Sequence, residues 1–431
     1  MPVRLKNADF NPLKTMHGVG VLCGLAAGAW LGGAEAPTKL VSPSLSPVAI
    51  SLCMVAGVFV ARWTVPSILV GSNYIFADLK EKKHLIVWGV LAGALWAVAN
   101  TLTIFAIRDV GLAIAFPLWN TNCLVGIFWG WLLFRELRGA PVQNYLKVLG
   151  GSIAIVLAAC MLAVSSMHAV GAVQENAHQG ILAALGASLM WGTMYVPYRK
   201  AYLSGMNPLS FVTVFTIGEL GTMILLAASS RGGIHPIVLQ LQLARNQLFW
   251  LFLGGFCWVI GDLFQQYATK YIGIGRAIPL SNTNQLWGLA WGALVFGELA
   301  GADLKQRLIV VTGSFVMLLG AMAISTSAAG AEEFLSTDRA ILRECERYKL
   351  DYGRALASQS GNVAGEKSNT GKRWWDYGIL IGAVGIFAWL ADGVVRLAIS
   401  MNFFWLRTLV ALLVLIFLGG CWSLWKRAGF S

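Results

Sequence analysis

The sequence is poor in charged residues. Only 12% of its 431 residues are Asp, Glu, Lys or Arg, which is about half the share that is usual in a soluble domain. Hydrophobic residues make up 57% of the chain, and the mean hydropathy is +0.67. This composition excludes an ordinary soluble domain and predicts an integral membrane protein.

Several patterns that carry chemistry are also missing. The seven cysteines show no C-x-x-C spacing, and the five histidines fall in loops or at the ends of apolar runs. The carboxylates are scattered, and no glycine-rich loop ends in Lys as a phosphate-binding loop does. We therefore expect no metal site, no disulfide, no cofactor and no enzymatic activity, and the lack of an ATP motif argues against a primary pump.

Apolar runs of about the length that crosses a bilayer recur along the chain. Strict in/out alternation, as in a transmembrane barrel, is absent, so we predict an all-α integral membrane fold. The predicted spans are 17–36, 49–70, 85–107, 111–134, 147–167, 180–202, 209–228, 248–269, 273–297 and 306–327, followed by 376–397 and 402–425.

The net charge of +12 indicates orientation rather than a nucleic-acid partner. If the N-terminus is cytoplasmic, most Lys and Arg residues fall in segments on the inner side, as the positive-inside rule requires. We predict a multi-pass protein of a bacterial inner membrane, because no organelle address is legible. The first run ends in Ala34-Glu35-Ala36, which resembles a signal-peptide cleavage site. Its "LGGAEAPTK" also resembles "WGTMYVPYR" of the sixth run, so we expect it to be retained.

A repeat is the strongest pattern in the chain. "PLWNTNCLVGIFWG" begins at Pro117 and "PLSNTNQLWGLAWG" at Pro279, and the match runs without a gap from 95–139 to 257–301. Each unit holds five spans, so the second unit enters the membrane from the opposite side. We therefore predict two inverted repeats, 1–167 and 168–327, then a cytoplasmic linker with a surface helix, 328–373, and a two-helix extension, 374–431.

This pattern resembles the drug/metabolite transporter superfamily. The resemblance lies in the five plus five spans and in "GLAIAFPLWNTNCLVGIFWGWLLFREL" with its echo "GIGRAIPLSNTNQLWGLAWGALVFGEL". Within the superfamily, the chain is most similar to the sugar-transporting glucose/ribose porter group. The resemblance covers about residues 16–327 and implies a secondary transporter; it implies nothing for residues 328–431.

The repeated Asn-Thr-Asn triplets are the first candidate binding site. They fall near the centres of the fourth and ninth spans, where inverted symmetry brings the two units together. Asn and Thr offer donors and acceptors that suit a neutral polyol, and tryptophans can stack on sugar rings. The alternative is that these polar groups only join helices. The predicted substrate-binding residues are Asn120, Thr121, Asn122, Asn282, Thr283, Asn284, Gln265, Asn100, Trp96 and Trp258.

Ionisable residues inside spans are the second candidate. Asp262 and Glu219 lie near the middle of the eighth and seventh spans, and Arg62 lies near the middle of the second. Intramembrane carboxyl groups are typical of proton coupling. The alternative is that Arg62 pairs with Glu219 or Asp262 and only fixes the helices.

The linker is predicted to contain a surface helix that Ser336 caps and that runs to about Ala357, followed by a flexible segment, 361–371. Trp374, Trp375 and Tyr377 would anchor the next span at the membrane interface. The last two helices are candidates for oligomerisation, insertion or regulation.

Together these patterns predict a secondary transporter of a small polar solute, most simply a sugar, that works by alternating access and is coupled to protons. One alternative is an exporter of amino acids, drugs or other metabolites, because fold does not determine cargo. A different class is a membrane receptor or scaffold that binds a solute without moving it.

Overall fold

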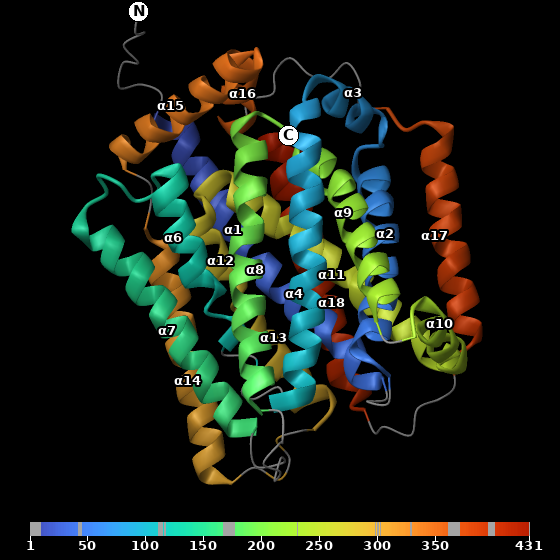
Figure 1. Cartoon of the computed structure of the whole chain (residues 1–431). Helices are drawn as coiled ribbons and strands as arrows, with labels where there is room; N and C mark the ends of the chain where they lie inside the picture. The colour runs from blue at the N-terminus through green and yellow to red at the C-terminus, as the bar shows by residue number, and fades with distance from the viewer. Residues whose placement is uncertain are drawn as a thin grey trace, which may run out of the picture.

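The computed structural model describes residues 10–41, 45–110, 115, 118–166, 177–230, 232–297, 299, 301, 303–327, 330–360, 371–394 and 401–430. In this part of the chain it contains helices and no strands (Figure 1). Ten of the described helices are long and apolar enough to cross a membrane. The protein is therefore an all-α, multi-pass membrane protein, as its composition predicted.

The helices follow the predicted spans closely, with a short helix between the second and third spans of each unit. The first unit contains α1 (Phe10–Glu35), α2 (Pro47–Leu69), α3 (Asn73–Glu81), α4 (Ile86–Val110), α6 (Asn122–Phe134) and α7 (Val142–Ser166). The second contains α8 (Ala177–Leu203), α9 (Pro208–Ser229), α10 (Ile234–Leu243), α11 (Arg245–Ile272), α12 (Ile274–Ser281), α13 (Asn284–Ala290) and α14 (Leu304–Ser325). The tail contains α15 (Ala331–Tyr348), α16 (Tyr352–Ser360), α17 (Trp374–Asp392) and α18 (Phe403–Ala428).

The ninth predicted span, 273–297, is not one continuous helix. Residues 273–297 form α12, a turn at Asn282 and Thr283, α13, and a π-helical turn at 291–295. Pro279 interrupts the backbone hydrogen bonding just before the break. The Thr283 hydroxyl donates to the Leu280 carbonyl at 2.7 Å, which offers the backbone a local alternative to the helix.

The fourth predicted span is interrupted in the same way. Among its described residues, 122–134 form α6, and a turn at Asn120 and Thr121 precedes this helix. The Thr121 hydroxyl donates to the Leu118 carbonyl at 2.6 Å, as Thr283 does in the second unit. Pro117 lies outside the described residues.

The helices of the two units pack reciprocally. When only the membrane-spanning helices are counted, the first of each unit packs on the third of the other, as α1 on α11 and α8 on α4. The second of each unit, α2 or α9, also packs on the third of the other, α11 or α4. The last spanning helices of the two units, α7 and α14, pack on each other. The short helices α3 and α10 lie toward opposite ends of the bundle (Figure 1). This packing is consistent with the inverted repeat.

Glycines allow the closest of these contacts. A Cβ added at Gly57 or Gly255 would lie 2.2 or 2.0 Å from a carbonyl oxygen across the α2–α11 contact. At Gly93 and Gly218, across the α4–α9 contact, the distances would be 2.0 and 1.9 Å. Small residues let helix backbones approach where lipid gives no hydrophobic driving force for association.

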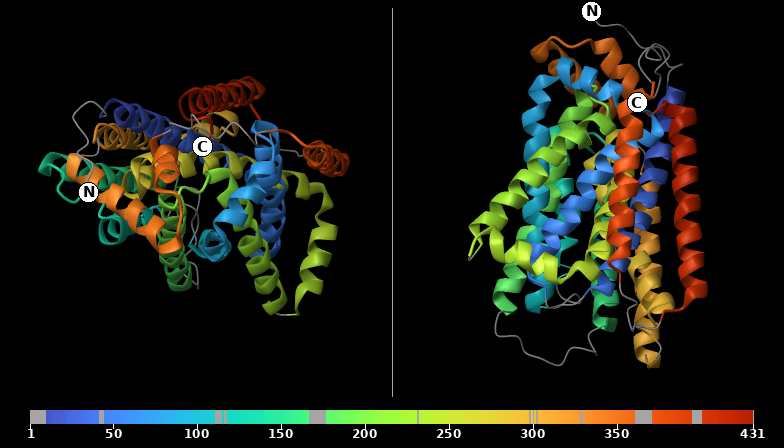
Figure 2. Two further views of the ribbon diagram at one scale, coloured as in Figure 1. Left: turned by 90° about the horizontal axis from the view of Figure 1, so that it is seen from above. Right: turned by 90° about the vertical axis from the view of Figure 1, so that its right-hand side faces the viewer.

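The tail covers one end of the bundle. Viewed from above, α15 and α16 cross the ends of other helices, whereas α17 and α18 stand at the edge (Figure 2). The predicted cap at Ser336 was wrong: α15 begins at Ala331, and the Ser336 hydroxyl donates to the Glu333 carbonyl inside the helix at 2.9 Å. The helix was also predicted to be continuous to Ala357, but it ends at Tyr348, where Lys349 takes a left-handed conformation. Of the predicted flexible segment, 361–370 lies outside the described residues.

Candidate transport site

The two Asn-Thr-Asn triplets are in contact. The side-chain amide of Asn282 donates one hydrogen bond to the Asn120 carbonyl and another to Asn122 Oδ1, each at 3.0 Å. Asn120 and Asn282 are 2% and 5% exposed. Residues 162 positions apart in the chain therefore join the two units at the point where each broken segment turns.

Helix α1 encloses the second triplet. A Cβ added at Gly28 would lie 2.3 Å from Thr283 Oγ1, and one at Gly32 would lie 2.3 Å from the Asn284 carbonyl oxygen. Asn284 Oδ1 is buried and has no hydrogen-bond partner among the described residues. The backbone of α1 thus forms one wall of the site, and that wall requires glycine.

The first triplet contacts α8. The Thr121 hydroxyl lies 2.8 Å from Ser188 Oγ. Ser188 could not be predicted as a site residue, because one serine in an apolar span has no pattern that indicates binding. Both triplets therefore make contacts with the first helix of a unit, α8 or α1.

Three tryptophans pack beside this region. The ring centroids of Trp96 and Trp258 are 4.9 Å apart, and Trp191 lies 5.9 Å from the first and 6.1 Å from the second. Trp96 is fully buried. The predicted pair is therefore close, and Trp191 of α8 completes a cluster that the sequence did not indicate. One turn beyond Trp96, Asn100 donates to Ser51 Oγ at 3.1 Å.

Arg62 pairs with Asp262. Arg62 Nη1 lies 2.8 Å from Asp262 Oδ2, and both side chains are fully buried. Gln266 Nε2 donates to the same oxygen at 2.8 Å. This pairing is one of the two that the sequence left open.

Glu219 is placed differently. It is fully buried, and neither carboxyl oxygen has a hydrogen-bond partner among the described residues. It lies close enough to Arg62 and Asp262 for an electrostatic interaction with both. Arg62 also lies 4.3 Å from the ring of Phe215, one turn before Glu219 on α9.

Buried polar atoms that have no hydrogen-bond partner among the described residues concentrate between α2, α8, α9 and α11. They are Arg62 Nε and Nη2, Tyr198 Oη, Tyr202 Oη, Ser210 Oγ, both oxygens of Glu219, Asp262 Oδ1, both amide atoms of Gln265, Gln266 Oε1 and Thr269 Oγ1. Folded proteins satisfy nearly all buried polar groups. A concentration of this kind is typical of an interior that water or a polar solute enters.

Known families match both halves of the chain. The "Sugar transport protein" family matches residues 47–165, and the "EamA-like transporter family" matches residues 178–326. Both halves of the chain are therefore similar to transporters of the drug/metabolite transporter superfamily. The protein is a membrane transporter rather than an enzyme.

Curated relatives of this transporter come from bacteria. The glucose uptake protein GlcU of Staphylococcus xylosus is 22% identical over 58% of this chain and 80% of its own length. A Streptococcus pyogenes serotype M1 protein, whose name assigns it provisionally to sugar uptake, is 25% identical over 59% of this chain and 85% of its own.

A carboxylate of the first unit binds the N-terminus of α12. Glu136, from the first unit, accepts hydrogen bonds from the amides of Ile274 and Gly275 at 3.0 and 2.9 Å. Arg199 Nε lies 3.4 Å from Glu136 Oε1. A carboxylate there satisfies free amides and complements the helix dipole. Glu136 therefore caps α12, whereas Glu298, its counterpart in the repeat, lies outside the described residues.

The tail binds to the same half-helix. Arg276 of α12 forms a bidentate ion pair with Glu333 of α15, at 2.7 and 2.9 Å, and both side chains are buried. Beside it, Lys270 donates to Ser358 of α16 at 2.8 Å. Burial alone would raise the pKa of Glu333, but the hydrogen bonds and charge of Arg276 outweigh it, and the pKa is lowered.

Gly28→Ala is expected to destabilise the transporter. The new methyl group would collide with Thr283 Oγ1, and overpacking of this kind costs about 1–3 kcal/mol. Thermal unfolding in detergent should show a Tm lower by several degrees. Gly18→Ala on the same helix is the matched control, because nothing lies within 4 Å of a Cβ there. Equal Tm values for the two variants would contradict the close contact between α1 and the triplet.

Glu333→Gln is expected to lower the Tm at pH 7, because it leaves buried Arg276 without its ion-pair partner, a loss of about 3 kcal/mol or more. Since the folded pKa of Glu333 lies below 4.5, the pair contributes fully above that value. Its contribution is lost as the pH falls through the folded pKa. The Tm difference from the unmodified protein should therefore shrink in acid. A difference that stays constant down to about pH 3 would show that the charge of Glu333 is not what matters.

Proposed function

We propose that this protein is a secondary transporter that moves a sugar by alternating access through the paired triplets. The observation that carries the proposal is the contact of Asn282 with Asn120 and Asn122 at two broken segments. Discontinuous helices near the midplane are where secondary transporters of inverted-repeat folds bind their substrates. The names of the bacterial relatives support a sugar as cargo.

The chemistry of the triplets favours a neutral polyol. Their amide and hydroxyl groups donate and accept without a net charge, as sugar hydroxyls do. The nearby Arg62 is paired with Asp262, so its charge is already compensated. Glu219, the other buried carboxyl group of this region, is assigned to proton coupling rather than to an ionic cargo.

The hydrogen bonds of Asn282 suggest how a sugar is admitted. In this conformation the amide of Asn282 bonds to the first triplet. A sugar hydroxyl can replace the same donor and acceptor, so the two halves separate without leaving buried polar groups unpaired. Asn284, Asn100 and Gln265 would contact the remaining hydroxyls, and Trp96 and Trp258 would contact the apolar ring faces.

The Arg62, Asp262 and Glu219 side chains are the proposed proton-coupling group. A buried charge without a partner is costly, so a proton bound at one carboxyl group favours pairing of Arg62 with the other. Exchange of the partner would move α2 relative to α9 and α11. This step links protonation to a change of conformation.

The orientation also remains a proposal. Lys200, Lys270 and Arg276 all lie at the end that α15 and α16 cover, through contacts with Glu344, Ser358 and Glu333. By the positive-inside rule this end is cytoplasmic. The proposed location is a bacterial inner membrane.

Asn282→Ala should reduce sugar uptake about tenfold or more, because it removes two hydrogen-bonding contributions of about 1 kcal/mol each. The purified protein in liposomes would receive labelled hexoses, pentoses and deoxysugars. Asn402→Ala is the matched control, since the hydrogen bonds given for the Asn402 side chain cap α18, and its backbone bond to Val295 is kept in the variant. If the intact, folded protein takes up none of these sugars in either orientation, the sugar proposal fails, and amino acids and organic cations should be tested next.

Glu219→Gln and Asp262→Asn are expected to abolish accumulation that a proton gradient drives. Glu219→Gln should retain sugar exchange at equal concentrations, because binding does not need the proton. Asp262→Asn leaves Arg62 unpaired, so it should be combined with Arg62→Gln to preserve folding. Asp303→Asn, at an exposed helix cap, is the control. Gradient-driven accumulation in both Glu219→Gln and the Arg62→Gln/Asp262→Asn variant would exclude this coupling group.

A further inference from the structure

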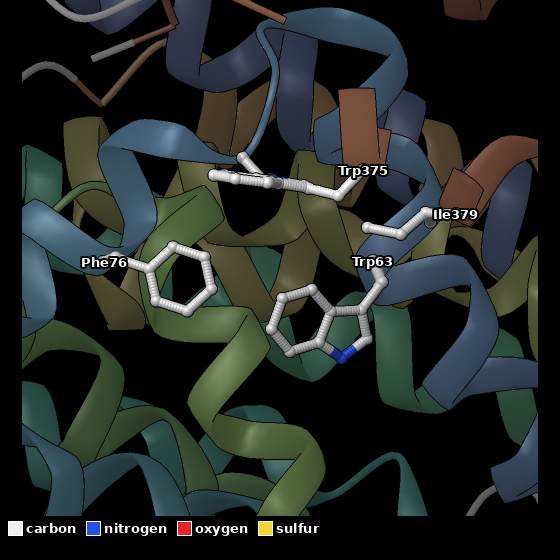
Figure 3. Close-up of a pocket in the computed structure, with 5 residues that line it drawn as sticks. Trp63, Phe76, Trp375 and Ile379 are labelled. Carbon is white, nitrogen blue, oxygen red and sulfur yellow. The ribbon is translucent and has the colours of Figure 1, made fainter. Parts of the chain in front are cut away.

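An apolar pocket lies between the C-terminal extension and the first unit (Figure 3). Its walls are Trp63 of α2, Ser72 of the turn before α3, Phe76 of α3, and Trp375 and Ile379 of α17. Its volume is about 210 Å³ and its exposed lining is entirely apolar. The pocket is open at its outer side and lies where α2 ends and α17 begins.

Polar bonds hold the two sides of the pocket together at one edge. Trp375 Nε1 donates to Ser72 Oγ at 2.8 Å, and the Ser72 amide donates to Asp376 Oδ1 at 3.0 Å. Asp376 Oδ2 accepts from the Arg373 amide at 2.7 Å. Because its indole N–H is satisfied, Trp375 presents only apolar ring surface to the pocket.

The rim of the pocket is basic. The Arg373 guanidinium lies 4.8 Å from the ring of Trp375. Lys372 is exposed, and its backbone lies against the turn that precedes α3. Lys80, also exposed, lies one helical turn beyond Phe76 on α3. The carboxylate of Asp376 keeps its negative charge, but it is buried and bound to the two backbone amides, whereas Lys372 and Arg373 are exposed.

We propose that the pocket binds an acyl chain of an anionic phospholipid from the surrounding bilayer, with the lipid phosphate at Arg373 and Lys372. An apolar hollow that opens toward lipid holds water poorly and accepts hydrocarbon readily. Basic residues next to a membrane-spanning helix attract anionic lipids, and each strengthens binding about fivefold. This proposal does not depend on the cargo.

The bound lipid would fasten α17 to the transport domain. Among the described helices, α17 packs mainly on α2 and, less, on α11, and much of its surface is exposed. A chain that fills the space between Phe76, Trp63 and Ile379 adds apolar contact on both sides of that joint. The lipid would thus act as a structural ligand of the C-terminal extension.

Native mass spectrometry can test the site. The protein would be exchanged into mixed micelles with phosphatidylglycerol or phosphatidylcholine of the same acyl chains. The intact protein should retain phosphatidylglycerol, and Lys372→Ala/Arg373→Ala should bind it about 25-fold more weakly. Arg138→Ala is the matched control, because Arg138 is also exposed and lies 5.0 Å from a tryptophan ring, that of Trp131.

A second variant tests the acyl-chain pocket separately. Ile379→Trp should fill the pocket and reduce retention of both lipids. A lipid with a photoreactive acyl chain should label peptides that contain Trp63 or Phe76 in the unmutated protein and not in Ile379→Trp. Equal phosphatidylglycerol binding by Lys372→Ala/Arg373→Ala and Arg138→Ala would overturn the headgroup assignment. Unchanged labelling in folded Ile379→Trp would overturn the pocket assignment.

Discussion

The hydrogen bonds from the Asn282 amide to Asn120 and Asn122 connect the two halves of the molecule where both membrane segments break. In a bilayer core, backbone groups without partners are costly, and irregular backbone is tolerated only inside the protein or along a hydrated cavity. The breaks therefore need polar groups around them. The triplets supply those groups, and under the proposed function the same groups exchange partners with the transported solute.

The position of α12 depends on restraints at both ends. Glu136 and Arg276 hold its N-terminus, and Asn282 holds its C-terminus. The Arg276–Glu333 pair joins this half-helix to the tail, so any movement of the triplet relative to the first unit must either carry α15 along or break a buried ion pair. Breaking such a pair costs several kcal/mol. In the proposed alternating-access mechanism, the tail therefore moves together with α12.

Hydropathy predicted where the helices are but could not show where they break. Hydropathy is the same whether an apolar segment forms one helix or two half-helices, and only the prolines before the triplets, Pro117 and Pro279, indicated an interruption. The contact between the triplets was predictable because repetition and depth together imply proximity. The partners Ser188 and Trp191 were not, since each is a single residue in an apolar span.

The contacts of the tail could not be predicted from its sequence either. Glu333 and Glu344 have the sequence context of surface charges, yet they pair with Arg276 and Lys200 of the bundle. Ser336 has the residue type of a helix cap, but the acidic residues before it, with the positive helix end, extend the helix to Ala331. The surface on which a helix docks depends on tertiary contacts, which the local sequence pattern does not encode.

The polar triplets are repeated in the two units, whereas the group of buried charges is not. The triplets occur in both units, so they can form an equivalent site whichever end is open. The ionisable group does not repeat: aligning the proline that begins α2 with the one that begins α9 places Arg62 opposite Met223 and Glu219 opposite Val58. A symmetric site alone cannot distinguish the two sides of the membrane. In the proposed mechanism the gradients of solute and proton set the direction of net transport, and the charged group on α2, α9 and α11 is the part that couples the two.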